Sequence, residues 1–479
     1  MLKSLFRKKT ISALNKESSS SNTLIRSIGP IQLILLGVGS IIGGGVFVLT
    51  GTAAFKYTGP AIVLSFTISG IVCIFAGLCY AEFASMIPVS GSSYTYSYVT
   101  LGELPAWLMG CSTILSYFLS AASVASGWSS YFIGLIEHFG LHIPEKISYT
   151  TGYPYSIYDG VVSKSIFNLP ALFIPIITTL ILLKGTRSSS IINSIAVIIK
   201  MTILSLFVIV GSTKVNLSNW TPFIPKNTGN FGDYGYSGII AGVSMVFLAF
   251  NGFDSICTAA QEVKNPQRNL PIGIIGSILI AMFTYTSVSA VLTGVVNYKN
   301  LNTAQPLALA AEEMNIPIFS LLIKFGAVSA ITSVLLVHQY AIVRIVYTIA
   351  KDGLLPSVLK KMHNKSHIPY VSTIITGVLI GMVAGTTNLE EIVKLSTFFI
   401  LLTIIVVCFS TIYLRYKEPH IERKFKCPMV PWIPIIAILF SLQILFRYPI
   451  ITTLYGMSAL LVCMIYYIYY GRHRSALIE

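Results

Sequence analysis

Residues 37–45 read Gly37-Val-Gly-Ser-Ile-Ile-Gly-Gly-Gly45, in the middle of a long apolar stretch that covers residues 32–55. Five of these nine residues are glycine. Glycine in the interior of a helix is destabilising by roughly 0.5–1 kcal/mol relative to alanine, because it loses more backbone freedom on folding. The stretch therefore predicts a long apolar helix that is unwound near its centre.

The whole chain is unusually apolar for its length. It has 479 residues, of which 54% are hydrophobic and only 10% are charged, whereas about a quarter of the residues in a soluble domain are charged. A chain with so few charges cannot cover its surface with polar groups, so we expect the lipid bilayer to be its solvent. The length alone would fit three soluble domains, but a single membrane bundle explains the composition better.

Apolar stretches long enough to cross a bilayer recur along the chain. A spanning helix needs about 20 predominantly apolar residues. Twelve candidate spans follow from this rule: 32–55, 61–87, 105–136, 167–183, 189–212, 236–260, 271–296, 318–350, 370–386, 392–415, 431–446 and 450–470. The eleventh is short and rich in proline, and the third and eighth are long enough to be tilted in the bilayer.

The basic residues indicate the orientation of these spans. The formal net charge is +15, and of the 32 Lys and Arg residues, 21 fall in the tails and loops on the side of the N-terminus, 7 on the opposite side and 4 within spans. Basic residues collect on the cytoplasmic side of membrane proteins. We therefore expect a multi-pass protein of the plasma membrane (the cell inner membrane in a Gram-negative organism) with both termini in the cytoplasm and no nucleic-acid partner. The polar N-terminal segment has no short apolar core, so no cleaved signal peptide is expected.

The sequence lacks the patterns of disulfide frameworks, metal sites and common hydrolases. The seven cysteines form no Cys-x-x-Cys pair and nearly all lie within apolar stretches, which predicts neither disulfides nor a metal site. Neither His-Glu-x-x-His nor Gly-x-Ser-x-Gly occurs. The two largest hydrophilic insertions, 137–166 and 351–369, are too short for a catalytic or sensor domain. We therefore expect no enzyme activity and no cofactor, and a function that resides in the membrane bundle.

A second broken helix is predicted in the sixth span. There, Leu248-Ala-Phe-Asn-Gly-Phe-Asp254 places a glycine, an amide and a carboxyl group at membrane depth, about 210 residues after the first break. Two interrupted helices, each opening a block of five spans, are typical of transporters built from inverted repeats. The predicted parts are a cytoplasmic tail (1–30), a first five-helix repeat (31–214), a second repeat (236–416), two additional helices (417–470) and a cytoplasmic C-terminal tail (471–479).

The two breaks predict a binding site. An unwound helix leaves backbone N–H and C=O groups without partners, and each such group costs several kcal/mol in hydrocarbon. The N-terminus of a half-helix favours a carboxylate, whereas free carbonyl groups favour an ammonium group or a cation. A zwitterionic amino acid supplies both charges. One break could equally reflect close helix packing through small residues, but two breaks at corresponding positions favour a substrate site.

Several further stretches resemble those of one family. They are Gly39-Ser-Ile-Ile-Gly-Gly-Gly-Val-Phe-Val-Leu-Thr-Gly51, Tyr80-Ala-Glu-Phe83, Pro88-Val-Ser-Gly-Ser-Ser-Tyr-Thr-Tyr96, Gly127-Trp-Ser-Ser-Tyr131, Gly252-Phe-Asp254, Glu262-Val-Lys-Asn-Pro-Gln-Arg268 and Lys351-Asp-Gly-Leu-Leu-Pro356. Through them the chain resembles permeases of the amino acid–polyamine–cation superfamily, and within it the bacterial cationic-amino-acid-transporter-like branch. The resemblance implies an all-α integral membrane protein of LeuT-like fold, with about twelve transmembrane helices in a 5+5 inverted repeat followed by two additional C-terminal helices.

The resemblance also implies which residues bind the substrate. The carboxylate of an amino acid would bind backbone groups at the first break, at Ile41, Gly43, Gly44 and Gly45. The amine would bind carbonyl groups at the second break, at Leu248, Ala249 and Asn251. Asp254 is the main acidic residue left near this site.

The chain departs from the family pattern at five positions. Gly44 stands where a threonine is usual, Leu248 where an aromatic gate residue is frequent, and Asn251 where an aliphatic residue is usual. Ser116 takes the place of a glutamate common in the third span, and Gln261 replaces another glutamate. These changes weaken the prediction of a strictly cationic substrate and leave a small neutral amino acid as the alternative.

Lys200 lies midway along the fifth span. A charged lysine near the centre of the bilayer costs roughly 3 kcal/mol on insertion scales, and burial disfavours the charged form of an amine, so such a lysine can exchange a proton near neutral pH. In proton-coupled relatives, a lysine at the matching point takes the place of the ion that sodium-coupled relatives bind. We therefore expect H⁺ as the coupling ion and Lys200 as the proton-coupling group. Alternatively its ammonium caps carbonyl groups of the broken first helix, and one residue could do both.

Three other polar residues fall within spans. We expect Glu82 to form an ion pair or to act as a gate at the cytoplasmic mouth, and Arg344 to anchor its helix. His338 stands where relatives usually have an apolar residue. We expect it to be a satisfied packing histidine rather than a second protonatable group.

The predicted function is secondary active transport of an amino acid by alternating access. The alternative is an exchanger of amino acids or polyamines with the same fold. The oligomeric state is not predicted.

Overall fold

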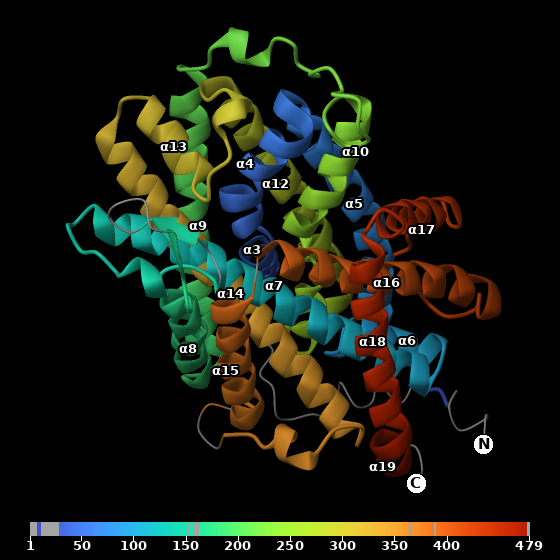
Figure 1. Cartoon of the computed structure of the whole chain (residues 1–479). Helices are drawn as coiled ribbons and strands as arrows, with labels where there is room; N and C mark the ends of the chain where they lie inside the picture. Colours follow the sequence, from blue (N-terminus) through green and yellow to red (C-terminus); the bar gives the residue numbers. More distant parts are fainter. Residues whose placement is uncertain are drawn as a thin grey trace.

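The computed structural model describes residues 7–10, 28–151, 154–156, 162–363, 366, 368–387 and 389–476. Within these residues the chain folds into one bundle of long helices (Figure 1). The predicted N-terminal tail lies largely outside the described residues, as do the last three residues of the C-terminal tail. The all-α membrane fold predicted from the sequence is confirmed.

The bundle is built from helices that follow the predicted spans. The first part contains α3 (Pro30–Ile41), α5 (Ile62–Met86), α7 (Glu103–Glu137), α8 (Leu169–Leu183) and α9 (Thr186–Ser212). The second part contains α10 (Gly235–Val246), α12 (Pro266–Val295), α14 (Pro317–Lys351), α15 (Tyr370–Thr386) and α16 (Leu389–Lys417). Two further helices follow, α17 (Trp432–Leu445) and α18 (Ile450–Tyr466). The division into two repeats at the predicted boundaries stays a prediction.

All twelve predicted spans correspond to helical segments. Among the described residues, eight segments are long and apolar enough to cross a membrane, and one of them, Pro30–Met86, holds the first two predicted spans. The shorter apolar helices α8, α15 and α17 lie at the fourth, ninth and eleventh spans. Helices α7 and α14 have 35 residues each, about 52 Å at 1.5 Å per residue, which exceeds the roughly 30 Å of bilayer hydrocarbon. Figure 1 shows α7 running obliquely across α8 and α15.

Several short elements were not predicted, among them two helices and two strands. Helices α6 (Ser93–Thr100) and α13 (Pro306–Glu313) connect longer helices, and each is only two turns long. Strand β1 (Pro154–Ser156) pairs antiparallel with β2 (Val162–Lys164) in the loop after α7. None of these elements is long enough to change the class of the fold.

Large apolar side chains face outward on the bundle. On α18, Leu454 is 61% exposed and Val462 65%, and on α12, Phe283 is 74% exposed. Such side chains are unfavourable in water over a large area, but the acyl chains of a bilayer cover them at no cost. The chain is therefore a multi-pass membrane protein.

Both ends of the described chain lie on one side of the bundle, which we call the terminal side (Figure 1). Ile28 N donates to Glu262 O at 3.0 Å, and Ala476 N donates to Asp352 O at 3.0 Å. The Lys9 ammonium forms an ion pair with the Asp352 carboxylate. The first and last described segments are thus fastened to the ends of helices from the second half of the bundle.

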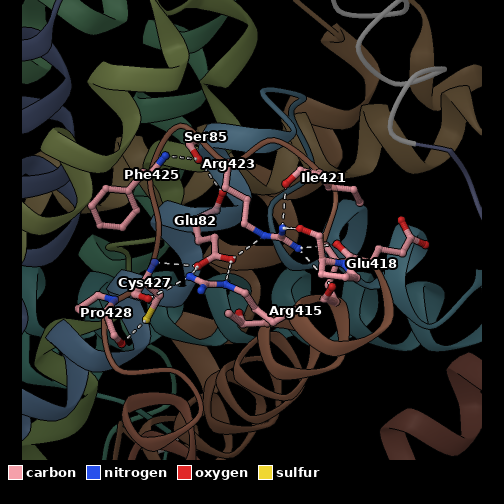
Figure 2. Close-up of polar contacts among 12 residues, drawn as sticks. Glu82, Ser85, Arg415, Glu418, Ile421, Arg423, Phe425, Cys427 and Pro428 are labelled. Carbon is pink, nitrogen blue, oxygen red and sulfur yellow. Dashed lines mark hydrogen bonds and ion pairs between the residues drawn. The ribbon is translucent and has the colours of Figure 1, made fainter.

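A buried carboxylate organises the loop between α16 and α17 (Figure 2). Arg415 donates to both oxygens of Glu82, with Nε 2.9 Å from Oε1 and Nη2 2.7 Å from Oε2. Arg423 Nε lies 3.1 Å from Oε1, and Cys427 N donates to Oε2 at 2.7 Å. The predicted pairing of Glu82 is confirmed, and its partners come from the loop that leads into the two additional helices.

Candidate substrate-binding site

The first predicted break is present. Helix α3 ends at Ile41, Ile42 has an extended backbone (φ −81°, ψ 108°), and helical turns resume at η1 (Gly45–Leu49). The first backbone hydrogen bonds of the resumed helix are accepted by Gly43 O, at 3.1 and 3.2 Å. The glycine amides 43–45 precede these bonds, and amides at the start of a helix have no partner within it and favour an anion.

The carbonyl end of α3 is capped by Lys200 from α9. The lysine is fully buried, and its Nζ donates to Gly39 O at 3.1 Å, to Ile42 O at 2.6 Å and to Ser333 Oγ at 2.9 Å. An ammonium group has three N–H donors, so all of them are used. Lys200 thus touches the first break as expected and satisfies carbonyl groups that would otherwise be unpaired in an apolar interior. Its role in proton coupling stays a prediction.

The second predicted break is also present. The sixth span is interrupted between η7 (Phe247–Phe250) and α11 (Ser255–Thr258). Asn251 has an extended backbone, and Gly252 has φ +109°, a conformation that glycine adopts far more readily than other residues. A Cβ at Gly252 would lie 2.2 Å from Ser40 Oγ. The two breaks therefore approach each other directly.

One tyrosine joins the two breaks, and sequence analysis missed it. Tyr285 on α12 is buried, and its hydroxyl lies 2.7 Å from Ile41 O and 2.8 Å from Ala249 O. These two carbonyl groups belong to the first and the second break. No local sequence signal marks Tyr285, because its partners lie 244 and 36 residues away in the chain.

A cavity lies between the breaks. It has about 450 Å³ of empty space, a figure that includes space open to solvent. Six of the eight predicted binding residues line it: Ile41, Gly44, Gly45, Leu248, Ala249 and Asn251. Ser40, Ser120, Ser123 and His338 add polar groups, and no Asp, Glu, Lys or Arg is among the lining residues.

The other two predicted binding residues do not line this cavity. A Cβ at Gly43 would lie 2.4 Å from Val334 Cγ2, so Gly43 faces α14 at close range. Asp254 accepts a hydrogen bond from Tyr117 OH at 2.5 Å and another from Ser92 Oγ at 3.1 Å. Its carboxylate is therefore engaged by α7 and by the turn before α6.

His338 on α14 lacks the well-formed hydrogen bonds expected of a satisfied packing histidine. It is 1% exposed and lines the cavity, yet neither ring nitrogen has a hydrogen-bond partner of good geometry. Ser40 on α3 is likewise fully buried beside the cavity, and its Oγ has no partner. These unpaired groups carry no sequence signal beyond the presence of a histidine in an apolar span.

An ion pair and an apolar cluster lie on different sides of the cavity. On the terminal side, the buried Arg344 guanidinium pairs with the Glu262 carboxylate, which also accepts from Tyr340 OH at 2.7 Å. On the opposite side, Leu49, Leu248 and Val393 form a small apolar cluster, and each is 7–8% exposed. The predicted anchoring of Arg344 is confirmed by its ion pair with Glu262.

The residues that the structure describes contain no cluster of three side chains suited to hold a metal ion. The seven cysteines are free thiols.

Gly45 and Gly44 offer a matched test of the first break. A Cβ at Gly45 would lie 2.3 Å from Ala249 Cβ and 2.7 Å from Ala249 Cα, whereas at Gly44 the nearest atom is Val124 Cγ2 at 3.5 Å. We expect Gly45→Ala to force the two breaks apart and reduce uptake at least tenfold, and Gly44→Ala to retain most of the wild-type rate. Initial uptake rates in proteoliposomes check this. Equal rates for the two variants would contradict the geometry.

Tyr285→Phe removes the hydroxyl that joins the breaks. Leaving a buried carbonyl group unpaired costs about 1–3 kcal/mol, so we expect a lower melting temperature and roughly tenfold weaker substrate binding. Thermal unfolding and equilibrium binding measure the two effects. Tyr236→Phe is the control, because Tyr236 is 78% exposed on α10. If the two variants behave alike, the bridge contributes nothing.

Two broken helices that face each other across a cavity, within a bundle of membrane-spanning helices, define a membrane transporter. The chain belongs to the amino acid permease family, whose sequence profile matches residues 28–469. It is therefore a permease of the amino acid–polyamine–cation superfamily and not an enzyme.

Three relatives illustrate the range of this family. The chain is 39% identical to the methylthioribose transporter of Bacillus subtilis (strain 168), over 99% of this chain and 100% of the relative. It is 38% identical to the branched-chain amino acid permease BcaP of the same organism, over 99% of both chains. It is 32% identical to cationic amino acid transporter 4 of Mus musculus, over 84% of this chain and 62% of the relative.

Proposed function

We propose that this protein is a secondary active transporter that carries a neutral amino acid by alternating access, in symport with protons. The observation that carries the substrate class is the cavity between the breaks, whose lining includes no charged side chain. A cationic side chain in this cavity would lack a counter-charge, because the nearby Asp254 is held by Tyr117 and Ser92 outside the lining. Burying an unpaired charge is far more costly than burying a neutral group.

The substrate carboxylate is proposed to bind the amides of Gly44 and Gly45 at the start of the resumed first helix. The substrate ammonium is proposed to bind carbonyl groups of Leu248, Ala249 and Asn251. Leu248 O already accepts from Asn251 N at 2.9 Å, and Ala249 O lies near Tyr285 OH. Each carbonyl oxygen has two lone pairs, so both can accept a further hydrogen bond from the ligand.

Proton coupling is proposed to reside in Lys200. The ammonium bonds to Gly39 O, Ile42 O and Ser333 Oγ, so it depends on the shape of the first break. A neutral amine has two N–H donors instead of three, and it would release one of these groups. Loss of the proton would therefore loosen the contact between α9 and the first break, which links protonation to movement of α3.

The topology completes the proposal. The excess of basic residues on the terminal side supports a cytoplasmic location of both termini, and the plasma membrane is the proposed location of the protein. The two repeats are proposed to span 31–214 and 236–416.

A second candidate cargo is a neutral hydroxylated solute. The cavity is lined by three serines, an asparagine and a histidine, which suit hydroxyl groups as well as an amino acid. A relative that is similar along its full length is named for methylthioribose. Such a solute has no carboxylate, so its binding would not depend on the amides of the first break.

A thermal-shift screen of the purified protein tests the cargo, because a ligand that binds the folded state raises the melting temperature by mass action. We expect neutral amino acids to raise it more than arginine, lysine or polyamines do. Uptake into proteoliposomes with an inward proton gradient then tests symport, since an exchanger would need preloaded substrate. A shift only with cationic amino acids, or only with methylthioribose, would contradict the proposal.

A further inference from the structure

The strongest unexplained feature of the cavity is a pair of buried polar side chains that lack a hydrogen bond of good geometry within the protein. Neither ring nitrogen of His338 has a hydrogen-bond partner of good geometry, and neither does Ser40 Oγ. Both residues are at most 1% exposed, and both line the cavity. Buried polar groups in proteins almost always have partners, so two such residues at one place indicate an external partner.

The two groups lie together at the meeting point of both breaks. A Cβ at Gly252 would lie 2.2 Å from Ser40 Oγ and 2.9 Å from His338 Nε2, so both atoms face the same backbone position. Backbone groups of Ser40 and Asn251 lie close to the imidazole as well. The pair is thus carried by α3 and α14 and faces the backbone of the second break.

Neighbouring side chains fix the orientation of the histidine without bonding to its nitrogens. The ring of Tyr117 lies 5.1 Å from the His338 ring, centroid to centroid. The Tyr117 hydroxyl is turned away, because it donates to Asp254. Packing therefore holds the imidazole in place, while its ring nitrogens lack a well-formed hydrogen bond.

We infer that His338 and Ser40 form a neutral hydrogen-bonding subsite that binds a hydroxyl or amide group on the substrate. This inference rests on the proposed function, in which the cavity holds the substrate. The subsite selects substrates with an uncharged polar group over apolar ones of the same shape. A site built to bond a substrate hydroxyl strongly rejects the analogue that lacks it, because its own buried groups are then left unpaired.

Threonine and valine test the subsite, since they have nearly the same shape and differ in one hydroxyl. We expect the wild-type protein to bind threonine at least tenfold more tightly than valine. In Ser40→Ala and His338→Leu, the ratio of the affinity for threonine to the affinity for valine falls toward one, mainly because threonine binds more weakly. His338→Gln keeps a side chain that can form hydrogen bonds, so we expect it to retain part of this preference for threonine.

Stability without ligand gives a second, independent readout. If His338 and Ser40 bind the substrate and have no structural partner, His338→Leu removes unsatisfied polar atoms from the ligand-free protein. The melting temperature then stays unchanged or rises. If the pair instead holds a structural water, the same variant lowers the melting temperature and leaves the ratio unchanged, which would overturn the inference. Ser287→Ala, whose hydroxyl donates to Phe283 O on α12, and His363→Gln, an exposed histidine, are the controls.

The outcomes separate the subsite from the proposed function. If threonine and valine are both transported with equal affinity by the wild type, or if the ratio survives both substitutions, the subsite is wrong and the transporter proposal stands. If the folded wild type binds no neutral amino acid, the proposed function fails and the subsite for such substrates fails with it.

Discussion

Lys200→Met is expected to abolish uptake driven by an inward proton gradient, with a loss of at least a hundredfold. The methionine keeps the length of the buried stem but removes the ammonium group that donates two hydrogen bonds to the first break and a third to Ser333 on α14. The measurement is uptake into proteoliposomes with and without a pH difference. Lys324→Met is the control, because Lys324 on α14 pairs at 3.3 Å with the half-exposed Glu312.

A second assay distinguishes a role of Lys200 in proton coupling from a purely structural role in capping the first break. Exchange of labelled for unlabelled substrate at equal pH on both sides does not require net proton movement. We expect folded Lys200→Met to keep measurable exchange that no longer responds to pH. If the folded variant still accumulates substrate against its gradient, the coupling role is excluded. If it loses exchange and substrate binding as well, the ammonium serves to hold the first break together.

Glu82→Gln is expected to produce the largest loss of stability. Glu82 is 2% exposed and holds Arg415, Arg423 and the amide of Cys427 at once (Figure 2). Removing one partner of a buried ion pair costs about 3–5 kcal/mol, because the remaining charge is left uncompensated. We expect a drop of several degrees in the melting temperature of the purified protein.

Glu418→Gln is the matched control for that substitution. Glu418 is exposed in the same loop, and the backbone carbonyl that accepts from Arg423 Nη2 at 3.1 Å remains after the change. A melting temperature close to that of the wild type is expected. If Glu82→Gln proves as stable as this control, the buried carboxylate does not fasten the loop.

The architecture was largely predictable because it depends on patterns that are local in the sequence. The run of glycines at 37–45 and the sequence 248–254 predicted two breaks, and both occur where expected. Capping of the first break was one of the two roles considered for Lys200, and the structure shows this contact. Apolar length alone predicted all twelve spans.

The finer arrangement of the site could not be predicted, because it depends on pairs that are far apart in the chain. Asp254 is only two residues from Gly252, yet its carboxylate bonds to Tyr117 and Ser92, which are 137 and 162 residues away. Proximity in sequence to a break does not decide which way a side chain turns. His338 is a similar case, since an unpaired nitrogen is visible only once all its neighbours are placed.

The hydroxyl of Tyr285 has one hydrogen and two carbonyl groups within reach, Ile41 O at 2.7 Å and Ala249 O at 2.8 Å. At any moment it can donate to only one of them. The carbonyl groups of the first and second breaks therefore cannot both accept this hydrogen bond at the same time. When Tyr285 donates to one of these carbonyl groups, the other lacks this hydrogen bond and can accept one from another donor.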